Sequence, residues 1–329
     1  MILTRAPLRI SLGGGGTDLP SYYARYGGFT LSAAINKYVY IYVNRPSADT
    51  LVRVKYSQYE QVSSVDDIRH DLVRPALRTL GLSGSLEIVS MADAPDGTGL
   101  GSSGSYLVAL LTSLHELKRE KVPIQALAEE AVHIELDLAG HPVGKQDHYV
   151  AAFGGITCLE IEADGTVTVS PLNMSATDRE ELRSSTLLFF TGLQRSSREI
   201  LQAQHDETER GCAAVVDSLH QAKEIGYRIK EVLERGDVDK FGQLLDEHWQ
   251  NKKRRSPHIS QPAIDHWYDL ALERGALGGK LIGAGGGGFL MLCCPRASKA
   301  SIREALSAEG LREMPFDFDL DGAKVLVNF

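Results

Sequence analysis

The residues from Pro95 to Ser105 form a stretch rich in glycine and serine, PDGTGLGSSGS. An apolar run over 86–89 precedes it and leucines at helical spacing follow it, which predicts a strand, a loop and a helix. Glycines let a backbone approach a ligand closely, and a helix N-terminus directs N–H groups and a positive dipole toward one place. With four glycines and three serines in eleven residues, this loop is suited to binding phosphate.

Two familiar phosphate loops do not account for the stretch. A Walker loop requires GxxxxGK[ST], and no lysine stands here. Gly99, Gly101 and Gly104 satisfy GxGxxG, but a dinucleotide-binding fold also needs a second strand with an acidic residue about 20 residues further on. The following segment, KREKVPIQALAEEAV, predicts a turn and another helix, so a dehydrogenase is rejected. A plain N-capping serine after a flexible loop stays the simpler alternative.

Two carboxylates are expected to point inward near this loop. On the helix predicted over 124–138, Glu135 falls on the apolar face. A buried carboxylate must be paired or bound to a metal, so a structural salt bridge and a metal site both stay open. Twelve residues later, Asp147 shares the apolar face of a short helix predicted over 144–153. His141 and His148 lack a compelling ligand spacing, which favours structural or surface roles over a metal cluster.

The elements around these residues predict an α+β fold. Strands are expected over 2–12 and 30–43, and the first of them places Arg5 and Arg9 on one face. In the second half, strands over 279–282 and 289–293 flank a loop with five glycines in six positions. So many glycines indicate close backbone approach to a ligand or to the first loop.

Two polar stretches receive plainer interpretations. The mixed polar segment over 172–185 is the expected linker between two domains. The basic run from Lys252 to Arg255 lies in a predicted helix, where a charge run is usually a solvated face.

Composition excludes several classes of protein. At 329 residues and 43% hydrophobic, the chain is long enough for two domains. A net charge of −8 argues against a nucleic-acid partner. No apolar run approaches the roughly 18 residues of a membrane helix, and no signal peptide is apparent. The four cysteines show no metal-ligand spacing, which is typical of reduced thiols in a cytoplasmic protein.

Three glycine-rich segments in this order resemble the GHMP small-molecule kinases. The family's first motif resembles RAPLRISLGGGGTD (Arg5–Asp18), its phosphate loop resembles PDGTGLGSSGS, and its third motif resembles KLIGAGGGGF (Lys280–Phe289). The resemblance spans essentially the whole chain. It implies a mixed α/β N-terminal domain over 1–180, a ferredoxin-like C-terminal domain over 181–329, and an ATP site between them.

The resemblance also assigns roles to individual residues. It implies Asp147 and Arg9 as catalytic groups and Ser103 and Glu135 as Mg²⁺ ligands. The residues implied to bind ATP come from the two later motifs: Pro95, Gly97, Gly99, Leu100, Gly101, Ser102, Ser103, Gly104, Ser105, Gly285 and Gly286. The residues implied to bind the sugar are Gly15, Gly16, Thr17 and Asp18. Galactokinases have Glu-His where this chain has Gly15-Gly16, which favours a bulkier substrate than galactose.

Within the family, the stretches RAPLRISLGGGGTDLPSYY and PVGKQDHYVAAFGG resemble the sugar-1-kinases that act on D-glycero-D-manno-heptose 7-phosphate. The resemblance implies transfer from ATP to the anomeric hydroxyl of this sugar phosphate, for nucleotide-activated heptose and surface polysaccharide synthesis. A fucokinase-like or other sugar-1-kinase is the alternative, and an inactive sugar or nucleotide sensor is the non-enzyme alternative. Arg195 is the favoured partner for the substrate's own phosphate, over the run 252–255. A homo-oligomer stays open.

Overall fold

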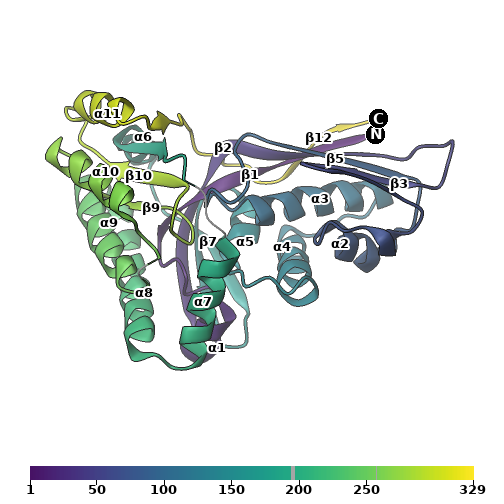
Figure 1. The fold of residues 1–329 in the computed structure, drawn as a ribbon, viewed down its shortest axis with the longest axis horizontal. Coiled ribbons are helices and arrows are strands. Elements are labelled where there is room, and N and C mark those ends of the chain that lie inside the picture. The colour runs from purple at the N-terminus through teal and green to yellow at the C-terminus, as the bar shows by residue number, and fades with distance from the viewer. Residues whose placement is uncertain (194–196, 257) are drawn as a thin grey trace.

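The computed structural model describes residues 1–193, 197–256 and 258–329 and contains two β-sheets (Figure 1). The first sheet has eight strands, in the order β12-β1-β2-β5-β3-β4, and β6 and β7 extend it from β2. Its strands are β1 Ile2–Gly13, β2 Gly28–Asn44, β3 Val52–Lys55, β4 Tyr59–Val62, β5 Leu86–Ala92, β6 Ile156–Ile161, β7 Val167–Pro171 and β12 Lys324–Asn328.

Helices cover one face of this sheet, because the apolar sides of β1 and β2 need a partner layer (Figure 1). α3 packs on both strands more extensively than any other helix, with Leu107, Leu110 and Leu114 completely buried. The helical segments of this half are α1 Pro20–Tyr26, η1 Val65–Asp67, α2 Val73–Thr79, α3 Ser102–Lys118, α4 Ile124–Val132, the π-helical turn η2 His133–Leu138, and α5 Gln146–Phe153.

The second sheet has four strands in the order β11-β8-β10-β9, all paired antiparallel. Its strands are β8 Thr186–Phe190, β9 Gly278–Leu281, β10 Phe289–Cys293 and β11 Arg312–Glu313. The accompanying helices are α6 Ala176–Ser185, α7 Ser197–Glu209, α8 Ala213–Glu234, α9 Val238–Lys253, α10 Pro262–Glu273 and α11 Lys299–Ala308. The two sheets with their helices confirm the predicted α+β, two-part fold.

The segment over 172–185, predicted to be the linker between two domains, does lead from β7 of the first sheet to β8 of the second, but most of it is the helix α6. The Ser175 hydroxyl accepts a hydrogen bond from the Asp178 N–H and caps the helix, while Leu182 is its buried residue. Because Leu182 is the one buried residue of this otherwise polar helix, the sequence of α6 has almost no amphipathic pattern from which a helix could be predicted. The division at residues 180 and 181 stays a prediction. The strand β12, which belongs to its second part, pairs antiparallel with β1 of the first sheet.

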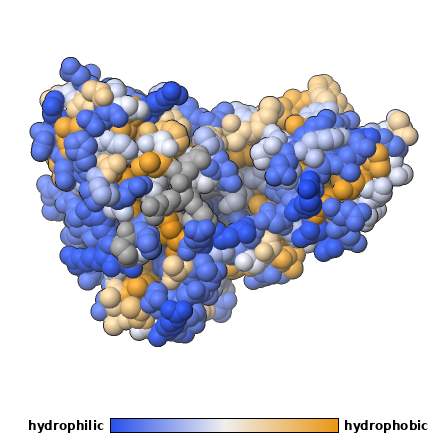
Figure 2. All heavy atoms as spheres, viewed as in Figure 1, coloured by the Kyte–Doolittle hydropathy of each residue, from blue (hydrophilic) through white to orange (hydrophobic). Residues whose placement is uncertain are grey.

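The surface facing the viewer is mostly hydrophilic, with hydrophobic residues scattered in small groups (Figure 2). In the part of the chain that the structure describes, no helix is both long and apolar enough to cross a membrane.

Candidate active site

The phosphate loop is built as its sequence predicts, between β5 and α3. Gly97, Gly99 and Gly101 have φ values of 73°, 81° and 77°, in the left-handed region that other residues avoid. Gly101 is the residue that precedes α3, which begins at Ser102. The Ser102 hydroxyl donates to Asp96 at 2.6 Å and closes the loop. The first N–H groups of a 17-residue helix therefore face the space beside the loop, where an anion is favoured.

The third glycine motif lies directly against this loop. A Cβ atom on Gly99 would stand 2.4 Å from the Ile282 carbonyl oxygen, and one on Gly283 would stand 2.4 Å from the Gly99 Cα. Both positions therefore need glycine because two backbones touch. Gly283 and Ala284 line the space beside the loop. Gly285 and Gly286 lie instead against Ile259, which accepts a hydrogen bond from the Gly286 N–H at 2.9 Å.

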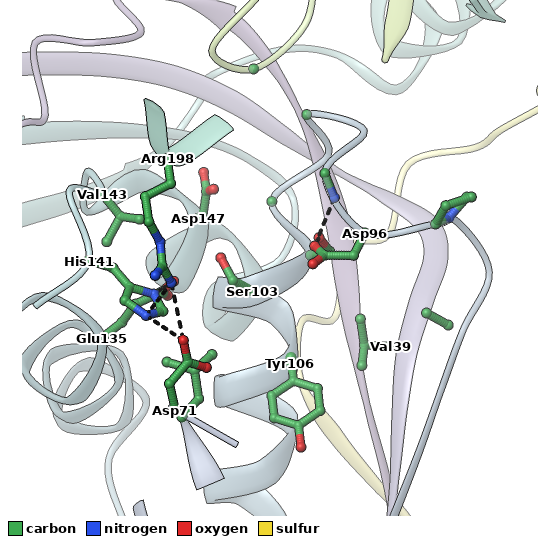
Figure 3. Close-up of a pocket in the computed structure, with 18 of the residues that line it drawn as sticks. Val39, Asp71, Asp96, Ser103, Tyr106, Glu135, His141, Val143, Asp147 and Arg198 are labelled. Carbon is green, nitrogen blue, oxygen red and sulfur yellow. Dashed lines mark hydrogen bonds and ion pairs between the residues drawn. The ribbon is translucent and has the colours of Figure 1, made fainter. Parts of the chain in front are cut away.

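A cavity of about 940 Å³ opens in front of the phosphate loop (Figure 3). Asp147, Ser103 and Glu135 border its polar part, and the residues Pro95, Gly97, Gly99, Gly101 and Ser102 of the loop line it as well. Toward the other end it is lined by apolar and aromatic side chains, among them Val39, Tyr56, Leu72, Met91 and Tyr106. A polar end and an apolar end suit a ligand that joins phosphates to a flat base.

The aromatic end was not predicted from the sequence. The His70 ring stacks on the Tyr106 ring at 5.0 Å, and Tyr56 meets the His70 ring edge-on at 4.7 Å. The Tyr106 hydroxyl is buried and has no hydrogen-bond partner among the described residues. These side chains come from three separate segments, so no short sequence motif contains them.

Arg9 and Asp147 form a close ion pair at the polar end. The Nε and Nη2 atoms of Arg9 both lie 2.7 Å from Asp147 Oδ1, and Nη1 donates to the Gly99 carbonyl at 2.5 Å. Arg9 is 4% exposed, whereas the Asp147 side chain keeps 23% of its surface open to the cavity. Arg9 therefore ties the carboxylate to the phosphate loop while one carboxylate oxygen stays accessible.

Glu135 lies at the back of the same cavity and is almost completely buried. His148 Nε2 is 2.7 Å from its Oε2, and His141 Nδ1 is 3.3 Å from its Oε1. Burial alone would raise the pKa of Glu135, but the hydrogen bonds from His141 and His148 outweigh it and lower the pKa to about 2. The carboxylate is therefore charged at neutral pH.

The donors around Glu135 fit a magnesium ion held jointly by protein and ligand. Among the described residues, no group of three or more His, Cys, Asp or Glu side chains is placed to hold a metal by itself. Mg²⁺ does not need one, since it commonly takes one or two protein oxygens together with water and substrate phosphates. A charged Glu135 carboxylate and the Ser103 hydroxyl, both lining the cavity, supply that donor set.

His141 continues the polar network to the cavity rim. Its Nε2 lies 2.9 Å from Asp71 and 2.6 Å from an Arg198 nitrogen, and Arg198 also donates to Asp71 at 3.1 Å (Figure 3). Hydrogen bonds to Asp71 and Glu135 raise the pKa of His141 to about 9. The two histidines thus serve Glu135 as partners: His148 from the interior, and His141 from the cavity wall.

A second, smaller cavity adjoins the first and shares Arg9, Asp147, Val143, Leu201, Gly283 and Ala284 with it. Gly15, Gly16 and Asp18, three of the residues predicted to bind the sugar, line it. Asp18 accepts from the N–H groups of Gly16 and Gln146, each at 3.1 Å, and burial raises its pKa. Thr17 has another role, because its hydroxyl donates to Gly14 and Phe29 carbonyls and holds the shape of the turn.

The basic run 252–255 is the clearest wrong prediction at this site. Lys252 and Arg255 are 8% and 9% exposed and line the second cavity, together with Lys280 and His248. The solvated face predicted for this run applies to the two residues between them, since Lys253 pairs with Asp265 and Arg254 is exposed.

The remaining predicted residues support the loop from behind. The Leu100 carbonyl accepts the Arg9 N–H at 2.9 Å, and the Ser105 hydroxyl donates to the Pro7 carbonyl at 2.7 Å. A Cβ on Gly104 would stand 2.8 Å from the Asp147 Cβ, so this glycine lets α3 and α5 come together. Arg195, predicted to bind the substrate's phosphate, lies outside the described residues.

Comparison with known proteins agrees with this arrangement of loops. Residues 70–155 match the GHMP kinases N terminal domain, and residues 229–311 match the GHMP kinases C terminal region. A D-glycero-alpha-D-manno-heptose 7-phosphate kinase from Campylobacter jejuni is 30% identical over 98% of each chain. An L-fucokinase/L-fucose-1-P guanylyltransferase from Bacteroides fragilis is 25% identical over 91% of this chain and 35% of that protein. The crystal structure of a D-glycero-D-manno-heptose 1-phosphate kinase from Bacteroides thetaiotaomicron covers all of both chains at 28% identity, with a TM-score of 0.83.

The chain therefore belongs to the GHMP kinases. The relatives that match it over most of its length include heptose, fucose and galactose kinases, which places it beside the sugar kinases of that family.

Proposed function

We propose that this protein transfers the γ-phosphoryl group of ATP to the anomeric hydroxyl of D-glycero-D-manno-heptose 7-phosphate, giving the 1,7-bisphosphate. The single observation that carries the proposal is the position of Asp147. It borders both cavities, so a base stands where a nucleotide on the phosphate loop would meet an acceptor beside Asp18.

The residues divide the work of phosphoryl transfer among them. Asp147 accepts the proton of the attacking hydroxyl through its open oxygen. Arg9 lies beside the Gly99 carbonyl and Asp147, where it neutralises negative charge that develops on the transferred group. The loop N–H groups bind the phosphates of ATP, and Asp18 binds sugar hydroxyls. Glu135 and Ser103 would hold Mg²⁺, which when bound would neutralise charge on the nucleotide phosphates.

Two relatives support a heptose phosphate as the acceptor. The names of these relatives put the phosphate at different positions of the sugar, since one is a 7-phosphate kinase and the other a 1-phosphate kinase. We favour the 7-phosphate because the acceptor's C1 hydroxyl must be free to give its proton to Asp147 and attack the γ-phosphorus of ATP, with ADP leaving. The cytoplasmic location expected from the sequence accords with the use of ATP and stays a prediction.

A comparison of acceptors tests the proposal. ADP release is measured with heptose 7-phosphate, heptose 1-phosphate, unphosphorylated heptose, fucose, galactose and mevalonate, with and without Mg²⁺. We expect the highest kcat/KM with heptose 7-phosphate, a 1,7-bisphosphate product by ³¹P NMR, and no turnover without Mg²⁺. A higher kcat/KM with fucose would favour the fucokinase alternative. ATP binding without turnover of any acceptor would favour the sensor.

A further inference from the structure

The second cavity contains a group of buried cationic side chains that no prediction placed there. His248, Lys252 and Arg255 follow one another at helical spacing on one face of α9 and its end, and Lys280 comes from β9. All four line the cavity that also contains Asp18 and Asp147, and none is more than 9% exposed. We call Lys252, Arg255 and Lys280 the buried basic cluster.

The buried basic cluster has no acidic partner among the described residues. Lys252 Nζ donates to the carbonyls of Leu281 and Gly283, and Lys280 Nζ donates to the Leu12 carbonyl. Arg255 donates to the Ser218 hydroxyl and the Gly15 carbonyl, while its Nη2 has no hydrogen-bond partner within the described part of the chain. Carbonyls satisfy hydrogen bonds but leave the net positive charge uncompensated, and a buried, unpaired charge is costly.

The two carboxylates in the cavity do not supply the missing charge. Asp147 is engaged by Arg9, and Asp18 by two backbone N–H groups. The burial of uncompensated positive charge lowers the pKa values of the cluster's own side chains. Burial, together with the charges of Arg255 and Arg9, lowers the pKa of Lys252 to about 7, and burial lowers the pKa of Arg255 to about 10. An anion in the cavity would reverse both shifts.

The glycines of the first motif let the cluster lie directly against the turn that precedes Asp18. A Cβ atom on Gly16 would stand 2.9 Å from Arg255 Nη1, and one on Gly15 would stand 3.1 Å from Ser11 Oγ. Any larger residue at Gly16 would have to displace the guanidinium. The Ser11 hydroxyl and both His248 ring nitrogens are also buried without a partner among the described residues, so the cavity holds unused donors besides its charges.

We propose that Lys252, Arg255 and Lys280 form the subsite for a phosphate group that the acceptor sugar already carries. The proposal rests on the proposed function and deepens it, because it assigns the second phosphate of the substrate to named residues. A phosphate dianion matches the cluster in charge and in its need for several donors. The nucleotide's own phosphates are the other source of the same chemistry, since Gly283 and Ala284 border both cavities.

Two variants of the cluster and one matched control test this assignment. Arg255→Gln and Lys252→Met remove one charge each, and Arg254→Gln removes an exposed charge from the same run. We measure kcat and KM for heptose 7-phosphate and for unphosphorylated heptose, KM for ATP, the Kd of heptose 7-phosphate by calorimetry without ATP, and Tm. We expect each cluster variant to weaken heptose 7-phosphate binding by about 10- to 100-fold. The preference for the phosphorylated over the unphosphorylated sugar should fall by a similar factor.

The remaining readouts separate the alternatives. The Tm of the cluster variants without ligand should be unchanged or higher, because an unpaired buried charge is removed, and Arg254→Gln should match the wild type throughout. An equal loss for both sugars, or a rise confined to the KM for ATP, would overturn the assignment in favour of the transferred phosphoryl group. If the wild type binds heptose 7-phosphate but does not phosphorylate it, the proposed function fails, and a loss of binding in Arg255→Gln still supports the subsite. If the wild type phosphorylates it and the variants do so equally well, the subsite alone fails.

Discussion

Arg9 contacts Asp147 Oδ1 with two nitrogens at 2.7 Å and the Gly99 carbonyl with a third, so one guanidinium joins the base, the phosphate loop and the first strand. The planar fork of an arginine makes three such contacts at fixed angles, which a lysine could not. Asp147 is thereby held at the boundary of the two cavities, both of which it lines.

Asp147→Asn tests the role of this base. The amide keeps the size of the side chain but cannot accept the sugar's proton, so we expect kcat to fall by about 10²- to 10⁴-fold with ATP binding retained. Steady-state kinetics and a fluorescent nucleotide titration measure the two quantities. Turnover near the wild-type rate would remove Asp147 from the mechanism.

Glu135→Gln distinguishes a metal ligand from a purely structural residue. The variant should lose activity that high Mg²⁺ partly restores. It should also lose about 1–3 kcal/mol of stability, because two histidines lose a charged acceptor. Activity titrated against Mg²⁺ and urea unfolding are the measurements. Reduced stability with an unchanged Mg²⁺ dependence would leave Glu135 a structural role only.

Gly99→Ala tests the contact between the two glycine loops, with Gly81→Ala as its control. Both glycines have positive φ, but a Cβ on Gly81 meets nothing within 4 Å, whereas one on Gly99 would collide with Ile282. We expect Gly81→Ala to cost about 1–2 kcal/mol of stability and leave the KM for ATP unchanged. Gly99→Ala should raise that KM by about 10- to 100-fold, because the loop is displaced. An equal KM for ATP in Gly99→Ala and Gly81→Ala would contradict the importance of the contact between the two loops for ATP binding.

His115 gives the stability a defined pH dependence. Its Nε2 lies 2.6 Å from Glu130 and its Nδ1 3.0 Å from Glu120, joining α3 to α4. The hydrogen bond to Glu130 raises the pKa of His115 above its ordinary 6.5 in spite of burial. Because the pKa of His115 is higher in the folded than in the unfolded protein, its protonation increases the free energy of unfolding. This contribution is complete below pH 6.5 and is lost as the pH rises through the pKa of His115 in the folded protein.

His115→Gln should therefore lower the free energy of unfolding at pH 6 by about 1–3 kcal/mol and have less effect at pH 9. Urea unfolding at the two values measures this. His133→Gln is the control, since its pair with Asp137 is exposed and is expected to contribute less than about 1 kcal/mol. An equal effect of His115→Gln at both pH values would contradict the assignment.

Short motifs predicted the residues that act through the backbone or lie close together in sequence. The phosphate loop, the Gly283 turn, Asp147 and the buried face of Glu135 follow from glycine spacing and helical periodicity, which are local properties. The sequence did not predict where side chains from distant segments meet. Arg5 shares a strand with Arg9, yet it stacks on Tyr38 at 4.0 Å and pairs with Asp319, which is 314 residues away.

The buried basic cluster was missed for a different reason. A run of four charges favours a solvated helix on average, and Lys253 and Arg254 obey that rule. The periodicity of α9 nevertheless contained the signal. Phe241, Leu245, His248 and Lys252 recur at intervals of three and four and are all buried, so Lys252 continues an apolar face. A charge at a core position of an amphipathic helix therefore indicates a binding site more strongly than the charge run itself indicates a surface.

The pairing of β12 with β1 has a consequence for synthesis of the protein. Ile2 to Arg5 pair with residues 324–328, so β1 has a bare hydrogen-bonding edge until more than 300 further residues have been made. Such an edge can recruit a strand from another chain. Arg9 lies further along β1, so part of the active site is built on a strand whose free edge is covered only after β12 has been made. We therefore expect a variant lacking residues 324–328 to aggregate more than the full chain, which light scattering of the two proteins would measure.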